Sequence, residues 1–250
     1  MVSVNRNDYA TEEVMSETTK PTIVLVHGAF AESGGWGPIV ERLQGEGHPV
    51  IAAANPLRSV AYDAAQVRAL LDSIEGPVVL VGHSYGGMVI SKAAAGAGNV
   101  KSLVYVAGFA PQAGDSAATL SSKYPGGTLA ETLRPVKLPD GNQDMYVAQE
   151  LYHQQFVADV PEATARIMAA TQRPITLAAL EEPAEGEQAW QSNPSFFVFG
   201  EADKNIPAAS QHFMAERAKA EAIVAIDGAS HAVFASHPAE VADVILRAGA

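Results

Sequence analysis

Runs of β-branched and aromatic residues recur along the chain and predict the strands of a sheet. Six runs are continuous rather than alternating, which is typical of parallel strands that are covered on both faces. They span residues 22–26, 50–53, 77–81, 102–106, 195–199 and 222–226. Apolar residues at helical spacing lie between them, as at Val67, Leu70 and Leu71. This alternation predicts an α/β fold with a doubly wound, mostly parallel six-stranded sheet.

One long interval lacks this alternation. Residues 111–193 show no convincing strand but contain two helical patches, at 145–157 and 162–170. Because structureless loops of this length are uncommon in a compact domain, we expect a helical cap inserted into the sheet. The expected division is a core of residues 21–110 and 194–250 and a cap of residues 111–193. Residues 1–20 are expected to form a disordered amino-terminal extension, with Met15 reading as a natural start.

Composition excludes several classes of protein. The 250 residues include no cysteine, which rules out disulfide scaffolds, thiolate metal sites and a cysteine nucleophile. Sixteen basic and 28 acidic residues give a net charge of −12, so nucleic acids and anionic membranes are disfavoured as partners. The chain has no apolar run long enough for a membrane span and no apolar secretory signal. We therefore expect a cytoplasmic protein.

The segment Gly82-His83-Ser84-Tyr85-Gly86 predicts a nucleophilic serine. It matches G-x-S-x-G and lies directly after the strand at 77–81 and before an alanine-rich helical stretch. In this setting a sharp strand-to-helix turn exposes the serine hydroxyl above the sheet. An ordinary turn with an uninvolved serine is the alternative. The placement between strand and helix favours Ser84 as the nucleophile.

A serine hydroxyl is a weak nucleophile until a base takes its proton, and that base is oriented by an acid. The expected chain order is serine, acid, histidine, with each partner after a later strand. Asp203 follows the strand at 195–199, and His231 follows the strand at 222–226. Both therefore lie at the carboxyl edge of the sheet with Ser84, which makes Asp203 the candidate acid and His231 the candidate base.

Other side chains compete for these two roles. His237 is the main rival for the base, since it lies six residues beyond His231 in the sequence. Glu201 and Asp227 are the rivals for the acid. Loop position favours His231, and Asp227 ends its strand too close to that histidine in sequence to face its Nδ1.

An acyl-transfer site also needs donors for the oxyanion and a pocket for the substrate. The main-chain N–H of Tyr85, directly after the nucleophile, is one expected donor. The other is expected from the loop after the first strand, where we choose Ala29. Five aromatic residues are candidate substrate-binding residues, although packing of the cap onto the sheet explains each of them equally well. They are Phe30, Phe109, Tyr152, Phe156 and Phe234.

These residues resemble the α/β-hydrolase superfamily across nearly the whole chain from residue 21 to 250. The chain is most similar to a small-esterase branch that includes plant methylesterases, hydroxynitrile lyases and bacterial carboxylesterases. The matching segments are 24–29, 81–88, 203–207 and 228–231. By this resemblance Ser84, Asp203 and His231 carry over as a catalytic triad, and Ala29 and Tyr85 as the oxyanion donors.

Two positions depart from the lyases of that branch. Those lyases carry a lysine after the catalytic histidine and a threonine in the first loop, where this chain has Ala232 and Gly28. The resemblance therefore implies an esterase that cleaves a small, largely uncharged carboxylic ester through an acyl-enzyme, with no metal and no cofactor. A carbon–carbon hydrolase, a lactonase or a cofactor-independent perhydrolase on the same triad stays open, as does a ligand receptor with little turnover. A homodimer stays open as well.

Overall fold

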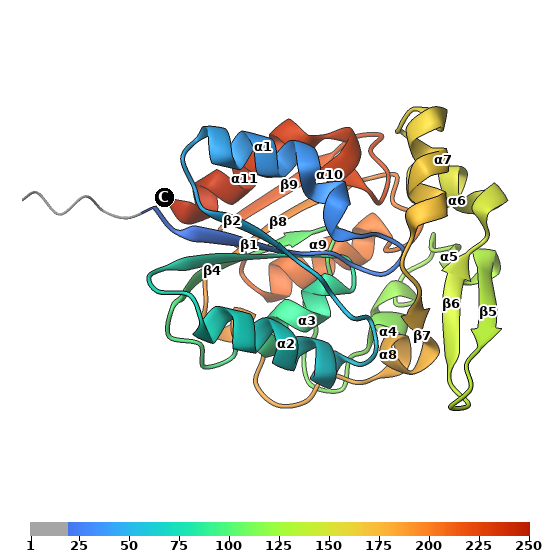
Figure 1. The fold of residues 1–250 in the computed structure, drawn as a ribbon, viewed down its shortest axis with the longest axis horizontal. Helices are drawn as coiled ribbons and strands as arrows, with labels where there is room; N and C mark the ends of the chain where they lie inside the picture. Colours follow the sequence, from blue (N-terminus) through green and yellow to red (C-terminus); the bar gives the residue numbers. More distant parts are fainter. Residues whose placement is uncertain (1–19) are drawn as a thin grey trace, which may run out of the picture.

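The centre of the molecule is a six-stranded sheet, seen in a computed structural model that describes residues 20–250 (Figure 1). Its strands are β1 (Thr22–Val26), β2 (Val50–Ala53), β3 (Val78–His83), β4 (Val100–Val106), β8 (Ser195–Gly200) and β9 (Ala222–Ile226). Their order is β2-β1-β3-β4-β8-β9, and every neighbouring pair is parallel. The predicted doubly wound sheet is confirmed. The extension predicted for residues 1–20 lies outside the described residues, apart from Lys20.

Helices cover both faces of the sheet, which explains why its strands are continuously apolar. The helices around it are η1 (Ser33–Trp36), α1 (Gly37–Gly45), α2 (Val60–Asp72), α3 (Gly86–Ala93), α9 (Ala208–Arg217), α10 (Val233–Ser236) and α11 (Pro238–Gly249). α1 packs against α11 on one face, and α2 packs against α3 on the other (Figure 1). No helix within residues 20–250 combines the length and the apolar character that crossing a membrane requires.

The strand order reverses at the centre of the sheet, between β1 and β3. The chain runs outward from β1 to β2 and then crosses back to β3, which pairs with β1 on its other side. The loops that follow β1 and β3 therefore leave the same edge of the sheet as neighbours. Ligands bind at such reversal points in open α/β sheets. The predicted residues Ala29 and Ser84 lie in these two loops.

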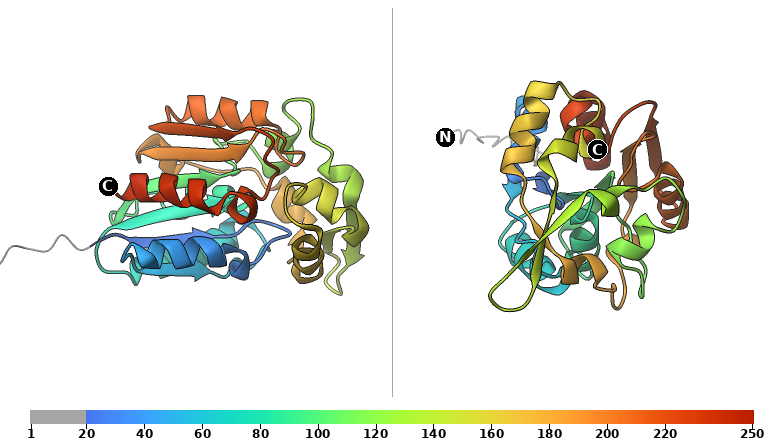
Figure 2. Two further views of the ribbon diagram at one scale, coloured as in Figure 1. Left: turned by 90° about the horizontal axis from the view of Figure 1, so that it is seen from above. Right: turned by 90° about the vertical axis from the view of Figure 1, so that its right-hand side faces the viewer.

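The segment between β4 and β8 forms a cap over the carboxyl ends of the central strands (Figures 1 and 2). Its helices are α4 (Ala117–Ser121), α5 (Leu129–Thr132), α6 (Gln149–Phe156), α7 (Glu162–Thr171) and α8 (Leu177–Glu181). The short helix η2 (Ala189–Gln191), at the end of the same segment, packs against α3 of the core. The cap therefore covers the edge of the sheet at which β1 and β3 end. Its boundaries at residues 110/111 and 193/194 stay a prediction.

The cap also contains strands, which corrects the expectation that this segment is purely helical. β5 (Leu133–Lys137), β6 (Gln143–Val147) and β7 (Ile175–Thr176) form a small antiparallel sheet in the order β5-β6-β7. β5 is largely exposed and contains Pro135, so its sequence lacks an apolar run. In β6 only the alternate residues Met145 and Val147 are buried, as in a strand with one covered face.

Candidate active site

Ser84 lies in a tight turn between β3 and α3. Its φ is 52°, a left-handed backbone conformation that is uncommon for residues other than glycine. A Cβ on Gly86 would lie only 2.5 Å from the main-chain oxygen of Val26, so the turn packs directly on β1. The N–H groups of Gly87 and Phe109 donate to the main-chain oxygen of Ser84 at 2.9 and 3.1 Å. The turn is thus fixed on both sides, as is typical of strained residues at functional sites.

Asp203 and His231 form a buried hydrogen-bonded pair. Nδ1 of His231 donates to Oδ2 of Asp203 at 2.7 Å. Oδ1 of the same carboxylate accepts from the N–H groups of Asn205 and Ile206, at 2.7 and 2.9 Å. Because the carboxylate accepts from Nδ1, the neutral imidazole carries its hydrogen there and presents a lone pair on Nε2. That Nε2 has no hydrogen-bond partner among the described residues.

Ser84 and His231 line the same cavity, which lies between the core and the cap. The cavity has a volume of about 240 Å³. Its wall on the core side includes the residues of the loops after β1 and β3. Its wall on the cap side comes from α4, α5, α6 and α8 and is largely apolar. Leucines of the cap that face it, none of which was singled out from the sequence, are Leu129, Leu133, Leu177 and Leu180.

Three of the five aromatic residues expected at the substrate pocket line this cavity. They are Phe30, Phe109 and Phe156. Tyr152 is not: its ring stacks on Phe156, with 5.1 Å between the centroids, and its hydroxyl donates to the main-chain oxygen of Phe30 at 2.7 Å. Tyr152 therefore supports the wall from behind, which corrects its expected position.

Phe234 is also absent from the wall, and it lies in a layer of aromatic rings that includes His83. Its ring lies 5.2 Å from that of Trp36 and 4.6 Å from that of His83. Burial, and then the neighbouring His231, lower the pKa of His83 well below its usual value. His83 therefore stays uncharged and packs next to the hydrogen-bonded pair of Asp203 and His231.

The two expected oxyanion donors lie on the cavity wall with Ser84. Ala29 and Tyr85 both line the cavity, and neither main-chain N–H has a hydrogen-bond partner among the described residues. Tyr85 is the residue that precedes the first turn of α3, where unpaired N–H groups and the helix dipole favour negative charge. Its side chain points to the core, where the hydroxyl donates to Oδ2 of Asp63 at 3.0 Å.

The rival candidates lie elsewhere. His237 is not on the cavity wall; its two ring nitrogens lie 3.6 Å from carboxylate oxygens of Asp159 and Glu240. Glu201 and Asp227 are exposed to solvent. Of these candidates, Asp203 and His231, which loop position favoured, are hydrogen-bonded to each other, and His231 lines the cavity.

Two polar residues of the site had no predicted role. Asn205 lies on the cavity wall, two residues after Asp203. Its place in the segment 203–207 was the only signal in the sequence. Asp63 is completely buried in α2, where it accepts the hydroxyl of Tyr85. An aspartate inside a helix normally indicates a solvated face, so no signal in the sequence distinguished it.

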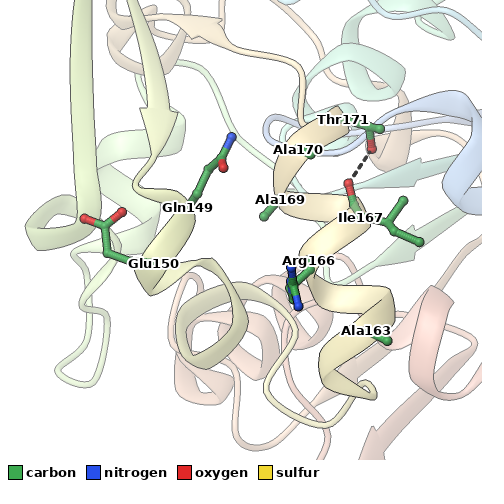
Figure 3. A pocket seen from close by; sticks show the side chains of 8 residues that line it. All are labelled: Gln149, Glu150, Ala163, Arg166, Ile167, Ala169, Ala170 and Thr171. Atoms are coloured by element: carbon green, nitrogen blue, oxygen red, sulfur yellow. Dashed lines mark hydrogen bonds between the residues drawn. The ribbon is translucent and has the colours of Figure 1, made fainter.

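A second hollow lies on the outside of the cap, between α6 and α7 (Figure 3). Gln149 and Glu150 line it from one helix, and Arg166 and Ala169 line it from the other. Thr171 supplies a hydroxyl group to this hollow, and that hydroxyl donates to the main-chain oxygen of Ile167 at 3.2 Å. No residue that lines the hollow is a serine or histidine. Within residues 20–250, no group of three or more His, Cys, Asp and Glu side chains could hold a metal ion. The candidate active site is therefore the cavity that contains Ser84.

Known proteins resemble the chain over nearly its full length. Esterase PIR7B of Oryza sativa subsp. japonica is 24% identical over 266 aligned residues, which cover 93% of this chain and 97% of that protein. Norfluorocurarine synthase 2 of Strychnos sp is 26% identical over 260 residues, which cover 94% and 97%.

Solved structures resemble the fold. The crystal structure of polyneuridine aldehyde esterase matches with a TM-score of 0.79 and 20% identity, over 91% of this chain and 98% of that one. A methylesterase from Arabidopsis matches with a TM-score of 0.74 and 18% identity, over 91% and 98%. The sequence pattern of the Alpha/beta hydrolase family matches residues 23–244. With this match added to the fold and to the turn at Ser84, the chain belongs to the α/β hydrolase family.

Proposed function

We propose that the protein is a serine hydrolase that cleaves a small, largely uncharged carboxylic ester through an acyl-enzyme on Ser84. The observation that carries this proposal is the hydrogen bond between Asp203 and His231, whose Nε2 is left free in the cavity that also contains Ser84. The esterases among the similar proteins support the class of reaction.

The arrangement supports the following steps. Oγ of Ser84 attacks the carbonyl carbon of the ester while Nε2 of His231 takes the hydroxyl proton. Asp203 holds the ring and stabilises its positive charge, and the N–H groups of Ala29 and Tyr85 donate to the oxyanion. The bond to the alcohol oxygen then breaks, and His231 returns the proton to that oxygen. Water attacks the acyl-enzyme by the same route, and the carboxylic acid leaves.

The cavity supports a substrate that is small and uncharged. Its volume of about 240 Å³ lies below the range of about 300–1,000 Å³ that is usual for ligand pockets. Apart from His231, the ionisable residues on its wall are Tyr85, whose hydroxyl is bonded to Asp63, and Glu181. Glu181 is exposed and would repel a carboxylate or phosphate on the substrate. An apolar acyl or alkoxy group fits the leucine and phenylalanine side chains of the wall.

Ser84→Ala tests the nucleophile. The wild type should release a burst of para-nitrophenol from an activated ester and take up one fluorophosphonate label per chain. The variant should lose both, with kcat/KM lowered by at least about 10⁴-fold, because no acyl-enzyme can form.

Ser122→Ala is the matched control. Ser122 lines the same cavity, but its hydroxyl donates to the main chain of α4 at 2.8 Å. This variant should keep the burst and the label. A burst that survives in Ser84→Ala, or a label on another residue, would overturn the assignment. A label on Ser84 without turnover of any ester in a size series would overturn ester hydrolysis while leaving the nucleophile in place.

A further inference from the structure

A buried amide group on the cavity wall has an unpaired donor. Asn205 is only 2% exposed and lines the cavity together with Ser84 and His231. Its Nδ2 has no hydrogen-bond partner among the described residues. Of the buried side-chain atoms in that condition, the only other one on a cavity-lining residue is Nε2 of His231. A buried donor without a partner costs about 1–3 kcal/mol, so such a group in a binding cavity points to a ligand atom.

Neighbouring groups fix which end of this amide is left over. Nε2 of Gln155 donates to the main-chain oxygen of Lys204 at 3.1 Å, and that oxygen can only accept. The same Nε2 donates to Oδ1 of Asn205 at 2.8 Å. Turning the Asn205 amide around would place two NH₂ groups against each other. The oxygen is therefore used inside the protein, and the NH₂ group is the end without a partner on this cavity-lining residue.

The position of this donor is fixed relative to the reacting groups. The main-chain N–H of Asn205 donates to Oδ1 of Asp203 at 2.7 Å, and Asp203 in turn holds His231. On the other side, the hydroxyl of Thr128 donates to Oε1 of Gln155 at 2.9 Å, so the amide pair is held from the cap as well. A donor held this firmly selects for an acceptor at one distance from the ester carbonyl.

We propose that Asn205 determines specificity: its Nδ2 donates a hydrogen bond to a second oxygen of the substrate, separate from the ester group. This inference rests on the proposed function and narrows it. The substrate class is a small ester that carries an ether, hydroxyl or keto oxygen on an otherwise apolar chain. A site with a buried donor rejects an analogue that lacks the acceptor, because binding the analogue leaves the donor unpaired.

Pairs of esters that differ by one oxygen test the proposal. Each pair replaces one methylene by an ether oxygen: para-nitrophenyl methoxyacetate against butanoate, the methoxypropanoate against pentanoate, and methoxyethyl against butyl butanoate. The measured quantity is the ratio of kcat/KM within a pair, compared between the wild type and Asn205→Leu. The two esters of a pair differ in chemical reactivity, but this difference is the same for both enzymes and therefore cancels when their ratios are compared. We expect one pair to favour oxygen about tenfold or more in the wild type and to lose that preference in Asn205→Leu.

Two further variants keep the test decisive. Thr128→Val removes a bond behind Gln155 without changing which end of Asn205 is free, so the oxygen preference should remain. Gln155→Glu removes the donor that holds Oδ1, so Nδ2 turns toward the new carboxylate and the ether preference should disappear. This variant serves as the test if Asn205→Leu does not fold.

Equal ratios in the wild type and in the active variants, for every pair, would overturn the role of Asn205. That result would leave ester hydrolysis at Ser84 standing, whereas turnover in Ser84→Ala would overturn the proposed function itself.

Discussion

His27 follows β1 as a buried histidine whose surroundings require the neutral form. Its Nδ1 lies 2.9 Å from the main-chain oxygen of Gly28 and donates to it, while Nε2 accepts the N–H of Asn55 at 3.1 Å. Burial lowers the pKa of His27 from 6.5 to about 4. The neutral form of this histidine thereby connects the loop that carries Ala29 to the segment after β2.

The pKa of His27 makes stability depend on pH. Between pH 6.5 and about 4 the unfolded chain binds a proton at this residue that the folded chain does not. The free energy of unfolding should therefore fall as the pH drops through this window, by roughly 3 kcal/mol from His27. The lowered pKa of His83 acts in the same direction. Urea unfolding between pH 4 and 7 measures the slope, which should be shallower in His27→Gln; the same slope in both proteins would contradict the prediction.

The placement of candidate site residues at strand ends could be predicted from the sequence. Ser84, Asp203 and His231 each lie in the segment that follows an apolar run, and parallel strands bring their carboxyl ends to one edge. Asn205 could not be assigned in this way. Its free donor depends on Gln155, fifty residues earlier in the cap, and no local pattern shows that these two amides meet.

At the scale of elements, the end of β8 approaches the loop after β9 very closely. A Cβ on Gly200, the last residue of β8, would lie 2.1 Å from the main-chain oxygen of Ala229. That oxygen also accepts the N–H of Ala202 at 3.0 Å. Because Ala229 lies two residues before His231, this approach positions the loop that carries His231.

Gly200→Ala should separate these two segments. We expect it to lower the free energy of unfolding by about 1–3 kcal/mol, since added volume in a packed site forces the backbone apart. We also expect kcat/KM for an activated ester to fall, because the bond from His231 to Asp203 is stretched. Calorimetry and ester kinetics measure the two effects. Gly98→Ala is the matched control, since no heavy atom lies within 4 Å of its added Cβ, and unaltered activity in Gly200→Ala would refute the argument.

The elements of the cap were predicted less well than those of the core. Core strands are covered on both faces, so their apolar runs identify them directly. β5 is exposed at four of its five positions, and β7 has two residues. Such short strands are held by pairing with β6 rather than by their own propensity. The alternation of Met145 and Val147 was the one usable signal, and a helical interpretation of residues 145–157 obscured it.

At the scale of the whole molecule, Arg58 joins the core to the cap. Arg58 lies in the loop between β2 and α2. Its Nη1 contacts Oδ1 of Asp144 in β6 at 2.7 Å, and its Nη2 donates to the main-chain oxygen of Pro174 at 2.9 Å. Asp144 is only 13% exposed, so this pair is less screened by solvent than a surface pair. This side chain thus anchors the small sheet of the cap to the core loop, together with Thr176 of β7, whose N–H and hydroxyl donate to the main-chain oxygens of Leu57 and Arg58 at 3.1 and 2.7 Å.

Arg58→Met should loosen this anchor. We expect faster amide hydrogen exchange and faster proteolysis in β6 and β7, with protection in β1 and β3 unchanged, because those strands do not contact the guanidinium group. Arg42→Met is the control. Arg42 forms a solvent-exposed ion pair with Asp243 that joins α1 to α11 and does not involve the cap. Hydrogen exchange followed by mass spectrometry resolves the two regions. If β6 and β7 exchange at the same rate in the wild type and in Arg58→Met, the cap is held by other contacts.

The cavity takes its two walls from different stretches of the chain. Ser84 and His231 come from loops of the central sheet, whereas much of the apolar wall comes from residues 117–133 and 177–181. A directed-evolution library confined to those two stretches would therefore reshape the chamber without altering the groups proposed to react. The fold in this way separates the residues that shape the cavity from those proposed to carry out the chemistry, so the two can be varied independently.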